Sequence, residues 1–221
     1  MRRVPKIVVF LTAIWLLSAL SSCCPTIPAA LEASNPAQPL TLKWSFQMTG
    51  PSCDRVYADD LDGDGHKEVI AGAQIAENPY LYVINYDGTL KWKYQPGCCV
   101  LDVYAADLEG DGYKEVIAGS SDGYAYVFNY DGTLRWKYHI GACVTRVYAD
   151  DLDGDGYKEV FAGDRLFNYQ GELLWEAVGA YSVYMADLEG DGYKEFIIGS
   201  KSEQRVHVFN YNGTEKNGNI S

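Results

Sequence analysis

Beyond its N-terminal apolar run, the sequence has no segment with the 3.6-residue periodicity of an amphipathic helix, which argues against helical and α/β folds. The run itself, residues 7–20, has 14 residues, whereas a bilayer-spanning helix needs roughly 20. Histidine occurs only three times, as His66, His139 and His207, in differing local settings. No Ser-His-Asp arrangement, phosphate-binding glycine loop or zinc-ligand spacing is present. The commonest hydrolase, nucleotide-binding and zinc-dependent classes are therefore not indicated.

Basic residues are also few. The chain has 18 Lys and Arg against 30 Asp and Glu, for a net charge of −12. Nucleic acid and anionic membrane surfaces are therefore not expected as partners. Much of the negative charge lies in four short segments, where bound cations would neutralise it.

Residues 1–22 have the features of an export signal. Arg2, Arg3 and Lys6 precede the apolar run, as in secretory signal peptides. The residues Leu20-Ser21-Ser22-Cys23 resemble the lipobox of prokaryotic lipoproteins, which implies cleavage before Cys23 and a lipid on its thiol. We therefore expect an exported lipoprotein anchored to a membrane of the cell envelope, and an ordinary signal peptide is the alternative. Residues 23–39, rich in Pro and Ala, are predicted to be a tether.

An acidic, glycine-containing segment of nine residues occurs four times. The copies are DLDGDGHKE from Asp60, DLEGDGYKE from Asp107, DLDGDGYKE from Asp151 and DLEGDGYKE from Asp187. Their starts are 47, 44 and 36 residues apart, close to the roughly 40–50 residues of one β-propeller blade. Repetition at this period predicts a propeller.

The second repeat shows the strand pattern best. Short segments rich in aromatic and β-branched residues occur at 103–106, 115–119, 124–130 and 133–138, and Asp131-Gly132 is a strong hairpin signal. Four such antiparallel strands make one blade. We therefore predict an all-β fold over residues 40–214, a β-propeller of four four-stranded antiparallel blades, with a polar tail at 215–221. The third strand of the third repeat should be short.

The last repeat lacks a fourth strand after Asn212-Gly213, and a matching segment lies at the other end of the domain. Residues 41–46, TLKWSF, match residues 89–94, TLKWKY, almost residue for residue. We infer that this N-terminal strand completes the last blade and closes the ring, which leaves no long unpaired edge. The alternative is an open half-ring that closes by forming a homodimer.

Each acidic loop has carboxylates at positions 1, 3, 5 and 9 and glycine at position 6, which permits a sharp turn around a cation. Four carboxylates within nine residues repel one another without a counterion. Ligation by oxygen alone favours Ca²⁺ over zinc or copper, so we predict up to four Ca²⁺ ions. An EF-hand would place an acid at position 12, which holds Ala71, Ala118, Ala162 or Ile198 here. The EF-hand is therefore excluded, whereas a β-hairpin calcium loop is not.

The predicted ligands comprise four side chains and the carbonyl of position 7 in each loop. They are Asp60, Asp62, Asp64, Glu68 and the carbonyl of His66; Asp107, Glu109, Asp111, Glu115 and the carbonyl of Tyr113; Asp151, Asp153, Asp155, Glu159 and the carbonyl of Tyr157; and Asp187, Glu189, Asp191, Glu195 and the carbonyl of Tyr193.

The repeat V-Y-x-A-D-L-[DE]-G-D-G-x-K-E-[VF]-I-x-G, best kept in residues 103–119, resembles the FG-GAP/VCBS repeat of integrin α-subunit propellers and many prokaryotic surface proteins. The resemblance covers residues 40–214. It implies a β-propeller with Ca²⁺ in the blade hairpins, used mostly for adhesion or ligand recognition. The chain departs from the family in two ways: it has fewer repeats than is common, and I-A-G replaces the FG…GAP residues for which the family is named.

Cys53, Cys99 and Cys143 occupy equivalent places in the first three repeats, and Cys98 adjoins Cys99. Export permits disulfides, so we expect pairing among these four cysteines, with connectivity left open. A thiolate metal site and isolated core thiols are the alternatives. Tyr113, Tyr157 and Tyr193, at loop position 7, are candidates for an exposed rim that stacks on sugars.

The first functional hypothesis is a surface-anchored Ca²⁺-binding propeller that serves as a binding or adhesion module for a protein or glycan ligand. The second is a propeller enzyme, either a quinone-dependent dehydrogenase or a polysaccharide-degrading enzyme. The lack of paired acids outside the loops favours the first. A structural subunit of a larger envelope assembly is the third.

Overall fold

The computed structural model describes residues 41–48, 53–73, 79–176, 180–200 and 204–214. The chain divides into two units, Met1–Thr41 and Leu42–Ser221, and the strands of the described residues all lie in the second. The predicted signal peptide, the tether, the lipidation at Cys23 and the polar tail lie outside the described residues. Within the described part of the chain, no helix is long and apolar enough to cross a membrane.

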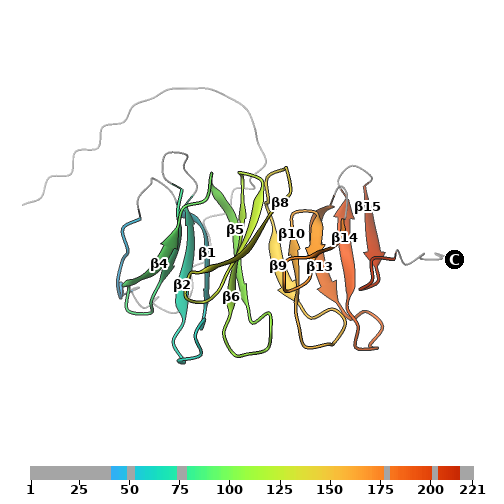
Figure 1. Ribbon diagram of the computed structural model, residues 1–221, viewed down its shortest axis with the longest axis horizontal. Helices are drawn as coiled ribbons and strands as arrows, with labels where there is room; N and C mark the ends of the chain where they lie inside the picture. The colour runs from blue at the N-terminus through green and yellow to red at the C-terminus, as the bar shows by residue number, and fades with distance from the viewer. Residues whose placement is uncertain (1–40, 49–52, 74–78, 177–179, 201–203, 215–221) are drawn as a thin grey trace, which may run out of the picture. The chain divides into compact units, whose positions relative to one another are not determined.

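Four antiparallel sheets follow one another along the chain, each with strands in sequence order (Figure 1). The first sheet contains β1 (Cys53–Asp59), β2 (Glu68–Ala73), β3 (Leu81–Ile84) and β4 (Leu90–Tyr94). The second contains β5 (Val100–Ala106), β6 (Glu115–Ser120), β7 (Tyr124–Phe128) and β8 (Leu134–His139). The third contains β9 (Val147–Asp150), β10 (Glu159–Ala162), β11 (Arg165–Phe167) and β12 (Leu173–Glu176). The fourth contains β13 (Ala180–Ala186), β14 (Glu195–Ser200) and β15 (Arg205–Phe209).

This arrangement confirms the predicted all-β, propeller-like fold of four antiparallel sheets. Each acidic loop joins the first two strands of its sheet, as the repeat pattern predicts. The strand β11 of the third sheet has three residues, so the predicted shortening is also confirmed. It is short because only Asp164 lies between Gly163 and the start of β11.

The core lies between successive sheets. Buried side chains of the first sheet, including Ile70 and Val83, cluster with Val103 and Phe128 of the second. A similar cluster joins the second sheet to the third, and another joins the third to the fourth. Because each sheet is apolar on both faces, each must be covered by a neighbour.

The acidic loops are joined by backbone hydrogen bonds from each loop to the one before. The amide of Lys114 donates to the carbonyl of Leu61 at 2.9 Å, and the amides of Lys158 and Lys194 do the same to Leu108 and Leu152. The three leucines, at loop position 2, are fully buried. Leu188 holds the same position in the fourth loop but is 54% exposed, since no further loop covers it in the described residues.

A tryptophan from the last strand of one sheet packs on a glycine-containing turn of the next sheet. The indole nitrogens of Trp92 and Trp136 donate to the carbonyls of Tyr130 and Tyr169 at 2.9 and 3.2 Å. The indole of Trp44 makes the same bond to Tyr86 at 2.9 Å. Residues 41–48 therefore take the place of an outer strand that precedes the first sheet.

The last sheet has three strands, and residues 41–48 are not assigned as a strand in the structure. In the described residues, Trp44 thus packs against the first sheet, and no fourth strand lies beside β15. Closure of the ring by the N-terminal segment stays a prediction.

The equivalent leucines offer a test of this stacking. We expect Leu108→Ala to lower the free energy of unfolding by about 2–5 kcal/mol, because it leaves a cavity between two loops. Leu188→Ala should cost far less, since that side chain is half exposed. Urea unfolding of the two variants measures both costs. Equal costs would mean that another surface covers Leu188, as a closed ring or a dimer requires.

Candidate metal centre

The first carboxylate of each acidic loop holds the loop backbone in place. The two carboxylate oxygens of Asp60 accept the amides of Gly63 and Gly65 at 2.8 and 2.9 Å. Both glycines have positive φ, 74° and 87°, which residues with a Cβ adopt at a cost. The position-1 aspartates of the other loops, Asp107, Asp151 and Asp187, make the same pair of bonds.

The carboxylate at position 5 closes a turn of its own. Oδ1 of Asp64 accepts the amide of His66 at 2.7 Å. The same bond, to the amide of position 7, is made by Asp111, Asp155 and Asp191 at 2.8–3.0 Å. These four bonds account for the aspartate at position 5 on structural grounds alone.

The glutamate at position 9 is buried and points back into its loop. Oε2 of Glu68 accepts the amide of Leu61 at 3.0 Å, and Glu115, Glu159 and Glu195 make the equivalent bond at 2.9–3.1 Å. All four glutamates are buried. A buried carboxylate requires a positive partner or a proton.

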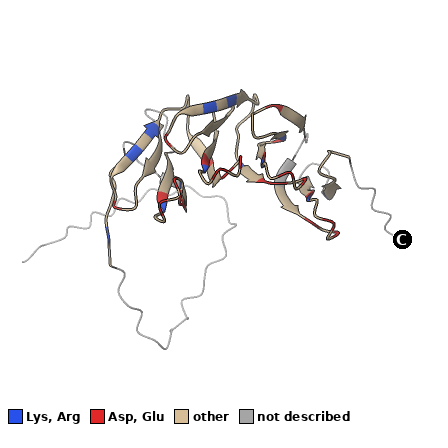
Figure 2. Cartoon of the chain, turned by 60° about the horizontal axis from the view of Figure 1, so that its bottom comes forward, with Lys and Arg blue, Asp and Glu red and all other residues tan. Residues whose placement is uncertain are grey.

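Carboxylates of positions 1, 3 and 9 come together in two of the four loops. In the first loop these are Asp60, Asp62 and Glu68, and in the third they are Asp151, Asp153 and Glu159, with one oxygen of each within 4.8 Å of the others. Figure 2 shows acidic residues in the loops and basic residues along the outer strands. The second and fourth loops form no such triad in the described residues. Ligation by position 5 and by the position-7 carbonyl stays a prediction.

The first two loops receive a basic side chain from the outer strand of their own sheet. The ammonium of Lys91 contacts Asp62 and lies 3.4 Å from Oε1 of Glu68. The guanidinium of Arg135 contacts Glu109 and lies 3.4 Å from Oε1 of Glu115. The hydrogen bond from Lys91 lowers the pKa of the Asp62 carboxyl.

The third loop has no such partner. No Lys or Arg makes an ion pair with Asp151, Asp153 or Glu159 in the described residues. Burial, together with the nearby charges of Asp153 and Asp155, raises the pKa of Glu159 to about 7. The ionised triad of this loop therefore lacks a counter-charge from the protein.

The residues of the triads fit a divalent calcium ion. All their donor atoms are carboxylate oxygens, which suit a hard cation. In the first loop, Oδ1 of Asp62 is buried and has no hydrogen-bond partner in the described residues, so one oxygen is left for a ligand. Carboxylate clusters that could hold a metal ion, as predicted from the sequence, are thus present in the first and third loops, with three side chains in each.

Lys91 and Arg135 were not among the residues predicted for the site. The sequence does carry a signal for them, since each directly precedes the tryptophan of an otherwise matching TLKW or TLRW segment. Their contact with the loops depends on how the fourth strand lies on its sheet. The local sequence does not predict that arrangement.

Of the four cysteines expected to pair, Cys98, Cys99 and Cys143 are not joined to one another by a disulfide in the described residues. Sγ of Cys98 and Sγ of Cys99 lie 3.8 Å apart, beyond bonding distance, and Cys143 contacts the carbonyl of Ser121. Disulfides among these three are therefore not formed in the structure. The side chain of Cys53 lies outside the described residues, so a disulfide that involves it stays a prediction.

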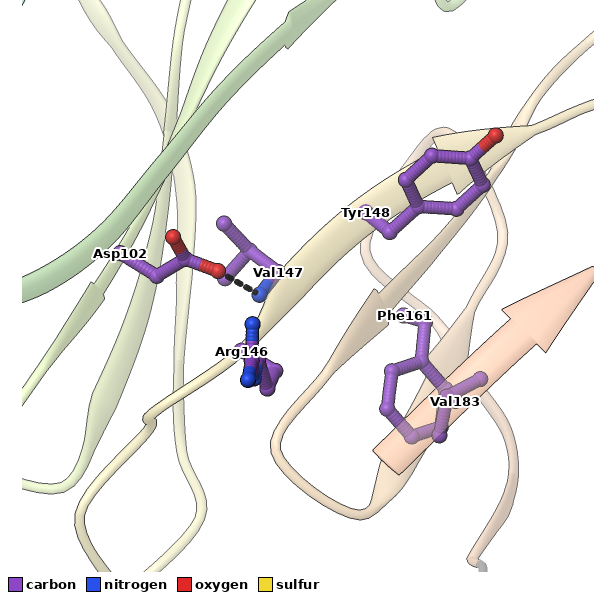
Figure 3. A pocket seen from close by; sticks show the side chains of 6 residues that line it. All are labelled: Asp102, Arg146, Val147, Tyr148, Phe161 and Val183. Atoms are coloured by element: carbon purple, nitrogen blue, oxygen red, sulfur yellow. Dashed lines mark hydrogen bonds between the residues drawn. The ribbon is translucent and has the colours of Figure 1, made fainter. Parts of the chain in front are cut away.

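A cavity of about 260 Å³ lies among the inner strands of the last three sheets (Figure 3). Asp102, Arg146 and Tyr148 line it together with apolar side chains. One carboxylate oxygen of Asp102 accepts the amide of Val147 at 3.0 Å, which joins β5 to β9. The cavity is smaller than the usual 300–1,000 Å³ of a ligand pocket, and its acid already bonds the backbone. The loops are the stronger candidate site.

Comparison with known families supports the repeat and the fold. Residues 60–118 match the model of the FG-GAP-like repeat, which confirms the resemblance predicted from the sequence over that range. Residues 96–144 match the model of the lambda-carrageenase beta-propeller domain. No curated protein matches the chain.

Several solved structures resemble the fold. The V. cholerae biofilm matrix protein Bap1 has a TM-score of 0.59 and 27% identity, over 73% of this chain and 27% of Bap1. Rhamnogalacturonan lyase YesW has a TM-score of 0.54 and 19% identity, over 74% of this chain and 42% of the lyase. BBS1N, solved in complex with ARL6DN, has a TM-score of 0.55 and 11% identity, over 73% of this chain and 54% of that one. The chain therefore spans about half or less of each of these structures.

Two substitutions at one glutamate test how the loop is held. Glu115→Ala removes both the acceptor for the Leu108 amide and a partner of Arg135, and should cost about 3 kcal/mol or more of unfolding free energy. Glu115→Gln keeps an oxygen for the amide and should cost clearly less. Urea unfolding in excess EGTA measures the loop without calcium. Equal costs would contradict the role of the hydrogen bond.

Proposed function

We propose that the chain is a Ca²⁺-binding β-propeller displayed at the cell surface, where it acts as a binding or adhesion module. The observation that carries the proposal is the pair of buried-glutamate triads in the first and third loops, the first of which lies within residues 60–118 that match the FG-GAP-like model. Calcium would be structural, because the triads lie in the hairpins that hold the first two strands of a sheet together.

The residues that would hold calcium are the triads Asp60, Asp62 and Glu68 and Asp151, Asp153 and Glu159. When bound, the ion supplies positive charge to carboxylates that otherwise repel one another. The remaining predicted ligands of the four loops are proposed to contribute where an ion is held. No catalytic step is assigned to these groups.

The proposed location rests on the N-terminal sequence. The charged start, the apolar run and the cysteine after Leu20-Ser21-Ser22 support export and lipid anchoring at Cys23. A tether rich in proline would then hold the propeller away from the membrane. An adhesion module requires such exposure.

Exposed aromatic pairs along the loops support a glycan as the ligand. The rings of Tyr113, Tyr157 and Tyr193, at position 7, stack on Tyr130, Tyr169 and Tyr211, with centroids 4.5–4.8 Å apart. The three position-7 rings are 40–41% exposed. Stacked, rigid rings with exposed area bind sugar faces at little cost in conformational entropy.

A binding role is favoured over catalysis by the settings of the histidines. The ring of His66 stacks on Tyr86, His139 packs on Tyr124, and His207 stacks on Phe209. Each ring contributes to packing, and the three lie on different sheets or loops. The similarity to the biofilm matrix protein Bap1 supports the same proposal.

Chelation tests the structural role of calcium. We expect excess EGTA to lower the melting temperature of the full chain, since each occupied site contributes about 2.7 kcal/mol at a hundredfold excess of ligand over Kd. Calorimetric melts in calcium and in EGTA give the difference, with calcium-saturated EGTA as the control. An unchanged melt would refute structural calcium.

Tyrosine substitutions test the glycan surface. The double variant Tyr113→Ala, Tyr157→Ala should weaken retention in gels that contain neutral or anionic polysaccharides, because two exposed rings are lost. Tyr184→Ala is the control, since that side chain is 66% exposed on β13, outside the loops. Wild-type migration unaffected by every polysaccharide would point to a protein ligand instead.

A further inference from the structure

The acidic loops look equivalent in sequence, but the described structure gives them different counter-charges. Lys91 lies between the position-3 and position-9 carboxylates of the first loop, and Arg135 lies between those of the second. A protein cation therefore lies against the position-3 and position-9 carboxylates of two loops. Both basic side chains are largely buried, so their charges are poorly screened by solvent.

A bulge in the outer strand places these side chains. In the first sheet, Trp92 pairs with Val83 and Leu90 with Ile84, so Lys91 is the extra residue of the outer strand. In the second sheet, Trp136 pairs with Val127 and Leu134 with Phe128, so Arg135 is the extra residue. Bulges redirect side chains in this way and recur at functional positions.

The third sheet has the same bulge with an apolar residue in it. Trp175 pairs with Leu166 and Leu173 with Phe167, which makes Leu174 the extra residue. Leu174 is 50% exposed. The triad of Asp151, Asp153 and Glu159 is thus left without the basic side chain that the first two loops receive.

We propose that Lys91 and Arg135 act as tethered cations that take the place of Ca²⁺ or compete with it, so that the third loop is the tightest calcium site. The inference rests on the proposed calcium binding and adds which loops are filled. The first loop, with its unpartnered Asp62 oxygen, would bind calcium weakly against Lys91. The second, where Arg135 contacts both glutamates, would bind it least.

Exchanging the bulge residues tests the proposal. Leu174→Lys should weaken the tightest calcium site at least tenfold in calorimetric titration of the full chain, because a tethered ammonium then competes with the ion. Lys91→Met should add a second tight site. Lys93→Met is the matched control, because it makes the same charge change on the same strand. The ammonium of Lys93 lies over the ring of Tyr80 rather than against the acidic loop.

The outcomes separate this inference from the proposed function. Tight calcium binding that is unchanged by Leu174→Lys and by Lys91→Met overturns the tethered cations and leaves calcium binding intact. A wild-type chain that takes up no calcium overturns the proposed function.

The tethered cations have an independent readout, which is the melt in EGTA. In EGTA, the Lys91→Met variant should have a lower melting temperature than the Lys93→Met variant. The reason is that the carboxylates of the first loop have then lost their only counter-charge within the described residues. Added calcium should remove the difference. Equal melting of the two variants in EGTA would overturn the inference even if calcium binds.

Discussion

Repulsion among carboxylates is the constraint under which the four acidic hairpins of this fold form. Each loop places four acids within nine residues, and the glutamate at position 9 is buried. Backbone amides offset part of the repulsion, since the first aspartate accepts two and the glutamate accepts one. The remainder requires a cation or a proton. In the first two sheets the outer strand supplies a Lys or Arg, whereas no Lys or Arg makes an ion pair with the triad of the third in the described residues.

The same loops couple one sheet to the next. The amide at position 8 bonds the carbonyl at position 2 of the preceding loop, and the leucine there is buried beneath the contact. Lys114 also pairs with Asp59 at 2.8 Å, and Lys194 with Asp150 at 2.7 Å. A change in how one loop is held therefore reaches the core between two sheets. Structural calcium in a single loop would in this way stabilise more than its own hairpin.

Much of the fold was predictable because the repeat carries redundant signals. The Asp-Gly turns, the alternation of apolar residues and the period of the acidic segments all indicate short antiparallel strands, and the observed bounds of β5 to β8 differ from the expected ones by a few residues. The site was predicted only in part. Positions 1, 3 and 9 converge in the first and third loops, Asp64 and its equivalents bond the backbone of their own loop, and no disulfide joins Cys98, Cys99 and Cys143 to one another in the described residues.

The amino-acid sequence alone determined the class of fold, the four acidic loops and their suitability for a hard cation, because these follow from residue types at short spacing. Only the tertiary structure decided which carboxylates meet and which of them find a protein cation. That outcome depends on the bulge residue of each outer strand, which is Lys91 in the first sheet, Arg135 in the second and Leu174 in the third; Lys91 is 29 residues from Asp62 in the sequence. Local spacing carries no information about such a contact, since it forms only when the outer strand crosses its own sheet.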